Sequence, residues 1–309
     1  MLLYLPVAEW PVNMFVIFGL GGAVGFISGM FGVGGGFLLT PLLVFSGISP
    51  AVAVATVSAQ VVASSTSGAL SYWRRRAIDW KMAGYLLVGG MVGSWVGVRV
   101  FAQLRSLGQL DLVVGLCYVV FLGFIGGFMT FESIGAMFAA RSKTPQPPKK
   151  LRAHNWIHGL PFRVRFPRSR LVISAIPVIL LGTGIGFLGT LLGIGGGFLI
   201  VPAMIYLLKV PANVVVGTSL VQMVATMSFS TFLQAAQNHT VDIVLGFLLM
   251  VGGVIGAQFG AQVGARLKGE QLRALLGLLI LAVGLRFAVD LVVTPAERYS
   301  ISVAIGGVP

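Results

Sequence analysis

A glycine-rich stretch occurs twice in this chain, each time within long apolar sequence. The first copy, GMFGVGGGFLLTP, spans residues 29–41, and the second, TLLGIGGGFLIVP, spans residues 190–202. A Walker-type nucleotide loop needs Lys and then Ser or Thr after its last glycine, whereas both copies continue with Phe-Leu. A dinucleotide fingerprint needs an acidic residue about 20 residues further on, which neither copy has. The clusters therefore do not predict nucleotide binding.

The composition predicts a membrane protein. Of the 309 residues, 57% are apolar and 9% are charged, whereas about 25% of the residues in soluble domains are charged. Apolar stretches such as residues 82–101 and 272–293 have the length of about 20 residues that crosses a bilayer core. The 43 glycines agree, because small residues let membrane helices approach closely. We therefore predict an all-α polytopic membrane protein.

The two glycine clusters belong to a longer internal repeat. An offset of 161 residues superposes the clusters, and two insertions of one residue extend the correspondence through the following helices. The matched pairs include Thr56 with Thr218, Gln60 with Gln222, and Asp79 with Asp242. Each half is predicted to contain a glycine-broken helix pair followed by three full-length transmembrane helices.

Basic residues divide the chain into three segments. Residues 131–170 contain nine Lys and Arg residues, some of them interleaved with aromatic residues, which is typical of a segment lying against anionic lipid headgroups. We predict a first transmembrane repeat over residues 1–130, this basic cytoplasmic linker over residues 131–170, and a second transmembrane repeat over residues 171–309. The net charge of +13 is accordingly assigned to cytoplasmic loops and not to nucleic-acid binding.

The loop charges predict that the two repeats are inverted. In the first half the loop at residues 74–81 is strongly basic. Its counterpart at residues 237–242 has no Lys or Arg, and the next loop, at residues 266–273, is basic instead. Lys and Arg collect in cytoplasmic loops, so this switch predicts opposite orientations of the halves and both termini outside.

The glycine clusters predict two short helices that begin inside the membrane. The apolar segments that follow them, residues 37–45 and 198–207, are too short to span a bilayer. The start of such a helix presents backbone N–H groups and the positive end of the helix dipole, which attract anions. The alternative, that glycines only allow close helix packing, is expected for Gly89, Gly93 and Gly97. The backbone predicted to bind the anion comprises Gly34, Gly35, Gly36, Gly195, Gly196 and Gly197.

The helix after each cluster carries hydroxyl and amide side chains. Most of the hydroxyls are expected to bond to their own backbone. Gln60 and Gln222 are costlier to bury and occupy matched positions, so they are the best side-chain candidates for binding a polar anion. The side chains predicted at the site are Thr56, Gln60, Ser64, Thr218, Gln222 and Thr226.

The acidic and histidine residues give little support for cation transport, metal binding or catalysis. None of the eight Asp and Glu residues lies in the middle of a predicted span, and Asp79 and Asp242 are expected as helix N-caps. An anionic substrate therefore fits better than a transported cation. His154 and His158 could share a helix face, but zinc would need further ligands. We expect no metal, no cofactor and no enzymatic activity, since no nucleophile or acid–base pair is visible within the spans.

These motifs resemble the TauE/SafE family of sulfite-exporter-type membrane proteins, also called TSUP. The resemblance is carried by GFISGMFGVGGGFLLTP, by GFLGTLLGIGGGFLIVP, by the polar helices downstream and by the duplication. It implies transport of sulfite, sulfoacetate or related organosulfonates across the bacterial inner membrane. We expect a secondary transporter, an exporter that binds its anion near the bilayer midplane. A passive small-anion channel is the alternative.

Overall fold

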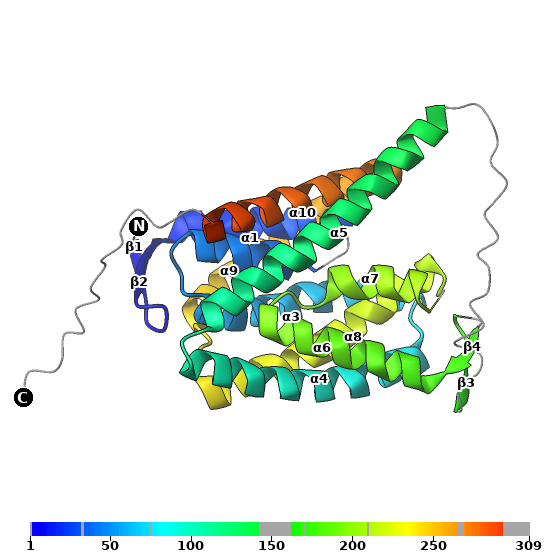
Figure 1. Cartoon of the computed structure of the whole chain (residues 1–309), viewed down its shortest axis with the longest axis horizontal. Helices are drawn as coiled ribbons and strands as arrows, with labels where there is room; N and C mark the ends of the chain where they lie inside the picture. Colours follow the sequence, from blue (N-terminus) through cyan, green and yellow to red (C-terminus); the bar gives the residue numbers. More distant parts are fainter. Residues whose placement is uncertain are drawn as a thin grey trace, which may run out of the picture.

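The same order of elements occurs twice along the chain (Figure 1). The computed structural model describes residues 2–31, 34–74, 76–141, 162–169, 171–208, 210–264 and 269–292. The first half contains β1 (Leu2–Leu5), β2 (Trp10–Asn13), α1 (Met14–Phe31), α2 (Gly36–Phe45), α3 (Pro50–Arg74), α4 (Trp80–Ser106) and α5 (Leu110–Arg141). The second half contains β3 (Arg163–Phe166), β4 (Leu171–Ser174), α6 (Ala175–Leu192), α7 (Gly197–Tyr206), α8 (Ala212–Leu233) with the π-helical turn η2 (Gln234–Asn238), α9 (Ile243–Gly264) and α10 (Gly269–Val292).

The helices have the length and surface of membrane helices. Among the described residues, five helical segments are long and apolar enough to cross a membrane: Trp80–Ser106, Leu110–Phe128, Ala175–Leu192, Val214–Asn238 and Ile243–Gly260. Large apolar side chains project from their outer faces, as Phe124, Leu180 and Phe247 do with 75%, 72% and 64% of their surface exposed. Such faces suit contact with hydrocarbon and not with water.

Two β-hairpins precede the two helical repeats, and the sequence analysis did not predict them. β1 and β2 are antiparallel, with Leu2 opposite Asn13. β3 and β4 are also antiparallel, with Arg163 opposite Ser174, which is the same pairing at an offset of 161 residues. β3 lies inside the segment that was predicted as linker, because its two arginines were grouped with the basic run. Residues 142–161, which include His154 and His158, lie outside the described residues.

Glycine faces join each half to the other. α1 packs along α9, and α4 packs along α6. A Cβ added to Gly25 of α1 would lie 2.6 Å from Gly253 Cα in α9, and one added to Gly93 of α4 would lie 2.8 Å from the Phe187 nitrogen in α6. The predicted packing role of the α4 glycines is therefore confirmed. The α4 glycines in this contact are Gly89, Gly93 and Gly97.

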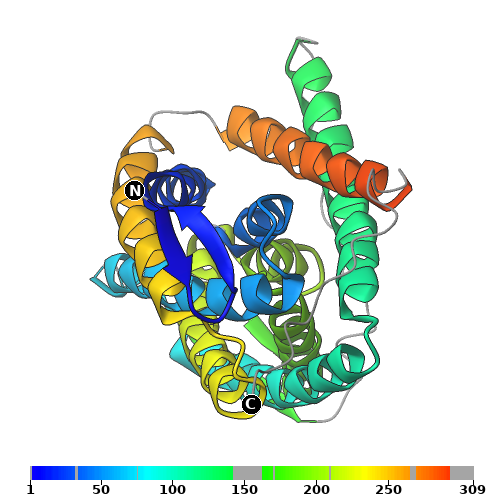
Figure 2. The same ribbon diagram turned by 90° about the vertical axis from the view of Figure 1, so that its left-hand side faces the viewer.

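The polar helices α3 and α8 lie between these pairs. They pack against each other, and α3 also packs against α9 while α8 packs against α4. Figure 2 shows α5 and α10, in green and orange, on one flank of the molecule and α1 with α9, in dark blue and gold, on the opposite flank. The short helices α2 and α7 pack against α3 and α8 respectively. The half-length helices are therefore held at the centre of the fold.

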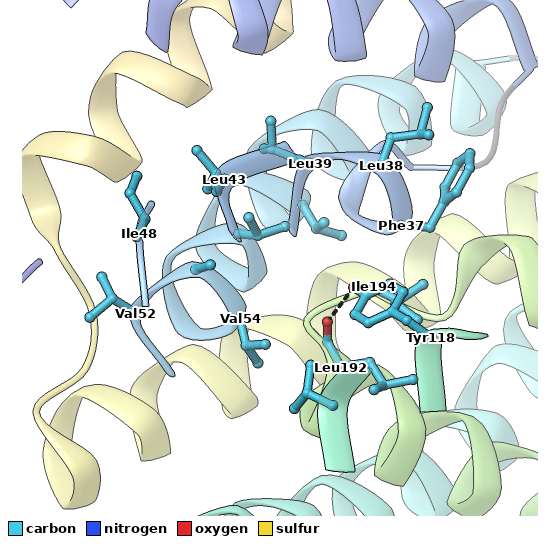
Figure 3. Packing of buried hydrophobic residues seen from close by; sticks show 14 of the residues in the cluster. Phe37, Leu38, Leu39, Leu43, Ile48, Val52, Val54, Tyr118, Leu192 and Ile194 are labelled. Atoms are coloured by element: carbon cyan, nitrogen blue, oxygen red, sulfur yellow. Dashed lines mark hydrogen bonds between the residues drawn. The ribbon is translucent and has the colours of Figure 1, made fainter. Parts of the chain in front are cut away.

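The first short helix is enclosed by apolar side chains from both halves. Leu39 and Leu43 of α2 belong to one buried cluster with Val54 of α3 and Ile194 of the second glycine break (Figure 3). In the same region the Tyr118 hydroxyl of α5 donates a hydrogen bond of 2.6 Å to the Leu192 carbonyl at the end of α6 (Figure 3). α5 is thereby fixed directly beside the second break.

We expect Gly93→Ala to destabilise the protein. The added methyl would clash with the Thr183 carbonyl and push α4 away from α6, which costs about 1–3 kcal/mol in a well-packed interface. Thermal unfolding in detergent should show a lower midpoint. Gly84→Ala is the matched control, because a Cβ at Gly84 of the same helix meets nothing within 4 Å. An equal fall in both variants would contradict the packing argument.

Candidate functional site

Each glycine cluster ends one helix and begins another. α2 and α7 start at Gly36 and Gly197, and each is 10 residues long, so the two short helices predicted from the sequence are confirmed. Within the breaks Gly34, Gly195 and Gly196 have φ of +71°, +73° and +74°. This left-handed backbone is readily available to glycine and strained for residues with a side chain. The glycines are therefore required for the helix interruption itself.

The two breaks lie against each other and against α3. A Cβ added to Gly36 would lie 2.7 Å from the Gly193 carbonyl oxygen and 2.8 Å from that of Ile194. Additions at Gly36 and Gly195 would meet the same side chain, Val61, at 2.8 and 2.5 Å. The structure thus brings both predicted helix starts together at one place on α3.

Backbone donors at the first helix start already have protein partners. The Gly35 N–H donates to the Ser28 hydroxyl of α1 at 2.7 Å, and the Gly36 N–H donates to the Gly34 carbonyl. An anion at this start would compete with these two bonds. Ser28 was not among the residues predicted from the sequence, although a serine one to two turns before a glycine break in an otherwise apolar helix could have indicated it.

The two matched glutamines are buried and only partly satisfied. Gln60 and Gln222 are each 1% exposed. Both amide atoms of Gln60, and the Gln222 carbonyl oxygen, have no hydrogen-bond partner among the described residues, whereas Gln222 Nε2 donates to Thr226 Oγ1 at 2.9 Å. Leaving a buried polar group unsatisfied costs about 1–3 kcal/mol. Both glutamines therefore have hydrogen-bonding capacity for a polar ligand or for water.

Each glutamine packs on a glycine of the other half. A Cβ at Gly253 of α9 would lie 2.6 Å from Gln60 Nε2, and one at Gly90 of α4 would lie 2.9 Å from Gln222 Nε2. Gln60 thus lies on the face of α3 next to α9, while Val61, about 100° further around the helix, faces the breaks. The glutamines are neighbours of the glycine breaks but occupy an adjacent face.

Two of the predicted site hydroxyls hold the starts of neighbouring helices. Thr56 Oγ1 accepts a hydrogen bond of 3.1 Å from the Asp242 backbone N–H, and Thr218 Oγ1 accepts one of 3.1 Å from the Asp79 N–H. Both aspartates cap their helices as predicted, through Met82 N–H to Asp79 and Leu245 N–H to Asp242. Other hydroxyls bond to their own helix backbone, again as predicted: Ser58 to Val54, Thr66 to Val62 and Ser219 to Val216. Ser64, which was predicted at the site, also donates to its own helix, to the Val61 carbonyl at 3.2 Å.

Ser65 and Met223 line the first break and were not among the predicted site residues. A Cβ at Gly34 would lie 3.5 Å from Met223 Sδ and 3.7 Å from Ser65 Oγ. Ser65 is fully buried, and its hydroxyl has no partner among the described residues. Its place in the polar run of α3 was the available signal.

Comparison with known protein families identifies the family of this chain. The family model described as sulfite exporter TauE/SafE matches residues 17–287, which contain both breaks and both glutamines. The chain belongs to the TauE/SafE family. It is 28% identical over 263 residues to a probable membrane transporter protein, YjnA, of Bacillus subtilis, covering 85% of this chain and 95% of the relative. No solved structure matches.

Other relatives of this TauE/SafE chain agree. A probable membrane transporter protein of Xylella fastidiosa is 30% identical over 285 residues, covering 88% of this chain and 94% of the relative. Sulfite exporter TauE/SafE family protein 3 of Arabidopsis thaliana is 29% identical over 126 residues, covering 40% of this chain and 26% of the relative. The chain is a multi-pass membrane transporter of the TauE/SafE family.

We expect Gly195→Ala to be more damaging than Gly34→Ala. Both positions have positive φ, which costs a residue with a side chain about 1 kcal/mol, but only at Gly195 would the methyl also meet Val61 at 2.5 Å. The thermal midpoint in detergent should fall further for Gly195→Ala. Adding Val61→Ala should reduce the difference between the two variants, and no reduction would contradict the assignment of the clash to Val61.

Proposed function

We propose that this chain is a secondary transporter that exports small sulfur-containing anions, such as sulfite or sulfoacetate-like organosulfonates. The anion binds near the bilayer midplane, between the starts of α2 and α7, with Gln60 and Gln222 in reach. The observation that carries the proposal is the pair of buried, incompletely hydrogen-bonded glutamines at matched positions beside the two breaks.

The chemistry of the helix starts favours an anion. A helix that begins inside a protein has its positive dipole end there, and two such starts meet around Val61. Gln60 can supply an N–H donor, and Ser65 an O–H donor. The Gln222 amide can also turn, since the Thr226 hydroxyl is able to donate as well as accept. Sulfite and sulfonates present several oxygen acceptors that these donors match, and the family description supports this class of substrate.

A transporter fits the packing better than a passive channel. The backbones of the two breaks are in direct contact, at Gly36 and Gly193, so an anion cannot pass between them without rearrangement. A channel would conduct through a path that stays open. Sulfite flux into proteoliposomes should therefore saturate and show counterflow, whereas flux that rises linearly with concentration would favour the channel.

The orientation of the halves follows the basic loops. We infer inverted repeats in a bacterial inner membrane, with both termini outside and the linker at residues 131–170 against anionic headgroups on the cytoplasmic side. All Lys and Arg residues except Arg99, Arg105, Arg286 and Arg298 then face the cytoplasm. The two hairpins at opposite ends of the molecule support this arrangement (Figure 1).

Gln60→Leu and Gln222→Leu should each weaken sulfite binding by roughly tenfold or more, because a hydrogen bond to a charged ligand is lost. Calorimetry on monodisperse protein measures the affinity. Gln103→Leu, at an exposed position of α4, is the matched control. The glutamine variants test binding more directly than valine at Gly35 or Gly196 would. At those two glycines a Cβ alone would clash with Val24 or Ile185, so the protein could lose its fold as well as its ligand. Unchanged affinity in both glutamine variants would move the site elsewhere.

Reporter fusions test the topology. A reporter inserted between residues 143 and 150 should be active only on the cytoplasmic side, and one placed after Ser302 only on the outer side. The expectation follows from an odd net number of membrane crossings in each inverted half. Signals from the same side would contradict the inversion and the alternating access that depends on it.

A further inference from the structure

We propose that the two hairpins are gates at opposite ends of the transport path, and that Asp79 and Asp242 are positioning residues that hold them closed. The proposal rests on the transport function proposed above. It extends that function by naming the elements that open, the side chains that keep them shut and their connection to the substrate site.

The Asp242 carboxylate connects α9 to the first hairpin. Asp242 is fully buried. Its Oδ1 accepts from the Leu245 N–H within its own helix, at 3.0 Å. Its Oδ2 accepts from the Val7 and Ala8 N–H groups in the turn between β1 and β2, at 3.0 and 3.4 Å. One oxygen therefore caps the helix, and the other holds the hairpin of the opposite repeat.

The Asp79 carboxylate makes the equivalent connection at the other end. Asp79 is 1% exposed, and its Oδ1 accepts from the Met82 N–H of α4 at 3.2 Å. Its Oδ2 accepts from the Ser169 N–H at 3.0 Å and from the Ser169 hydroxyl at 2.8 Å. Ser169 lies in the turn between β3 and β4, at an offset of 161 residues from Ala8. The same division of the two carboxylate oxygens thus occurs twice.

Each hairpin inserts an apolar side chain into the helical core beneath it. Leu5 of β1 and Phe166 of β3 occupy matched positions, and both are fully buried. Leu5 joins the cluster around α2 and α3, whereas Phe166 joins the cluster around α6 and α7 and packs edge-on against Tyr85 at 6.0 Å. The hairpins lie at opposite ends of the molecule (Figure 1). Lifting one hairpin would therefore uncover the core at one end only.

Asp242 and Asp79 are each connected to a glutamine of the candidate site through a single turn of helix. The Asp242 N–H donates to Thr56, which lies four residues before Gln60 on the same face of α3. The Asp79 N–H donates to Thr218, which lies four residues before Gln222 on α8. A shift of α3 that follows ligand binding at Gln60 would move Thr56 and disturb the hold of Asp242 on the first hairpin. The corresponding shift of α8 would act on the second hairpin.

Cysteine accessibility tests the gates in the full-length protein. Cys117 is the only cysteine, so Cys117→Ala gives a background in which Val12→Cys and Ile173→Cys report on the two hairpins. These matched strand positions are 7% and 5% exposed. In detergent, where a maleimide reaches both ends, Asp242→Asn should raise labelling of the Val12→Cys probe by about tenfold and leave the Ile173→Cys probe unchanged. Asp79→Asn should do the reverse.

The matched control is Asp111→Asn. Asp111 is an exposed aspartate in the first turn of α5, and its replacement should change neither probe. Ser169→Ala removes a single hydrogen bond to Asp79 and keeps the helix cap, so it tests the second gate even if Asp79→Asn does not fold. It should raise labelling of the Ile173→Cys probe by roughly threefold to tenfold. Equal increases at both probes, or none at either, would overturn the gates.

Labelling in the presence of sulfite distinguishes failure of the gates from failure of the proposed transport function. Saturating sulfite should raise labelling of at least one of the two probes, and Thr56→Val should abolish any response at the Val12→Cys probe while leaving the response at the Ile173→Cys probe unchanged. Saturable sulfite flux without end-specific labelling overturns the gates and leaves transport standing. The opposite result is end-specific labelling in the aspartate variants with neither sulfite flux nor a labelling response to sulfite. It supports the hold of Asp79 and Asp242 on the hairpins and overturns the proposed substrate.

Discussion

Backbone contact between glycine faces holds the two repeats together. Between apolar helices in lipid there is no hydrophobic driving force, so association depends on close packing and on hydrogen bonds. Gly25 of α1 reaches the backbone of α9, and Gly93 of α4 reaches the backbone of α6. Each contact joins a helix of one half to a helix of the other. The outer pairs are therefore formed from both halves, and neither half can move as an independent body without breaking them.

This packing also sets the space available to the candidate site. Gly90 meets Gly186 of α6 on one side and Gln222 of α8 on the other, and Gly253 has the same double contact with Gly25 and Gln60. A side chain at Gly90 would displace Gln222, and one at Gly253 would displace Gln60. A side chain at Gly186 or Gly25 would instead push against the backbone of Gly90 or Gly253 and separate the outer pair. Close helix approach and room for the two buried amides therefore depend on paired glycines in the same contacts.

Much of this organisation could be predicted from the sequence because it is local or repeated. The short helices follow from the glycine clusters, and the caps follow from the positions of Asp79 and Asp242. The hairpins could not be predicted in this way. The sequence of β1, LLYL, looks like part of an apolar terminal segment, and that of β3, RVRF, looks like part of the basic linker. Extending the offset of 161 residues to Leu5 and Phe166 was the signal that could have found them. Likewise, periodicity places Thr56 on the face of Gln60, but only the structure reveals that its hydroxyl binds the backbone of a residue 186 positions away.

The two halves match in architecture but differ in the side chains around the breaks. Val61 and Met223 occupy matched positions, as do Ser65 and Met227, and Ser28 corresponds to Gly189. If the halves were identical and inverted, the inward-facing and outward-facing states would be related by symmetry apart from the asymmetry of the membrane. Their energies would then be nearly equal. These substitutions remove that equality, because Ser28 and Ser65 provide hydroxyl groups beside one helix start only. In the proposed inverted arrangement, such differences would set which state the empty protein prefers, whereas the direction of net transport is set by the gradients across the membrane. The proposed inversion would thus relate the two states, and the departures from the repeat would determine how each state is populated.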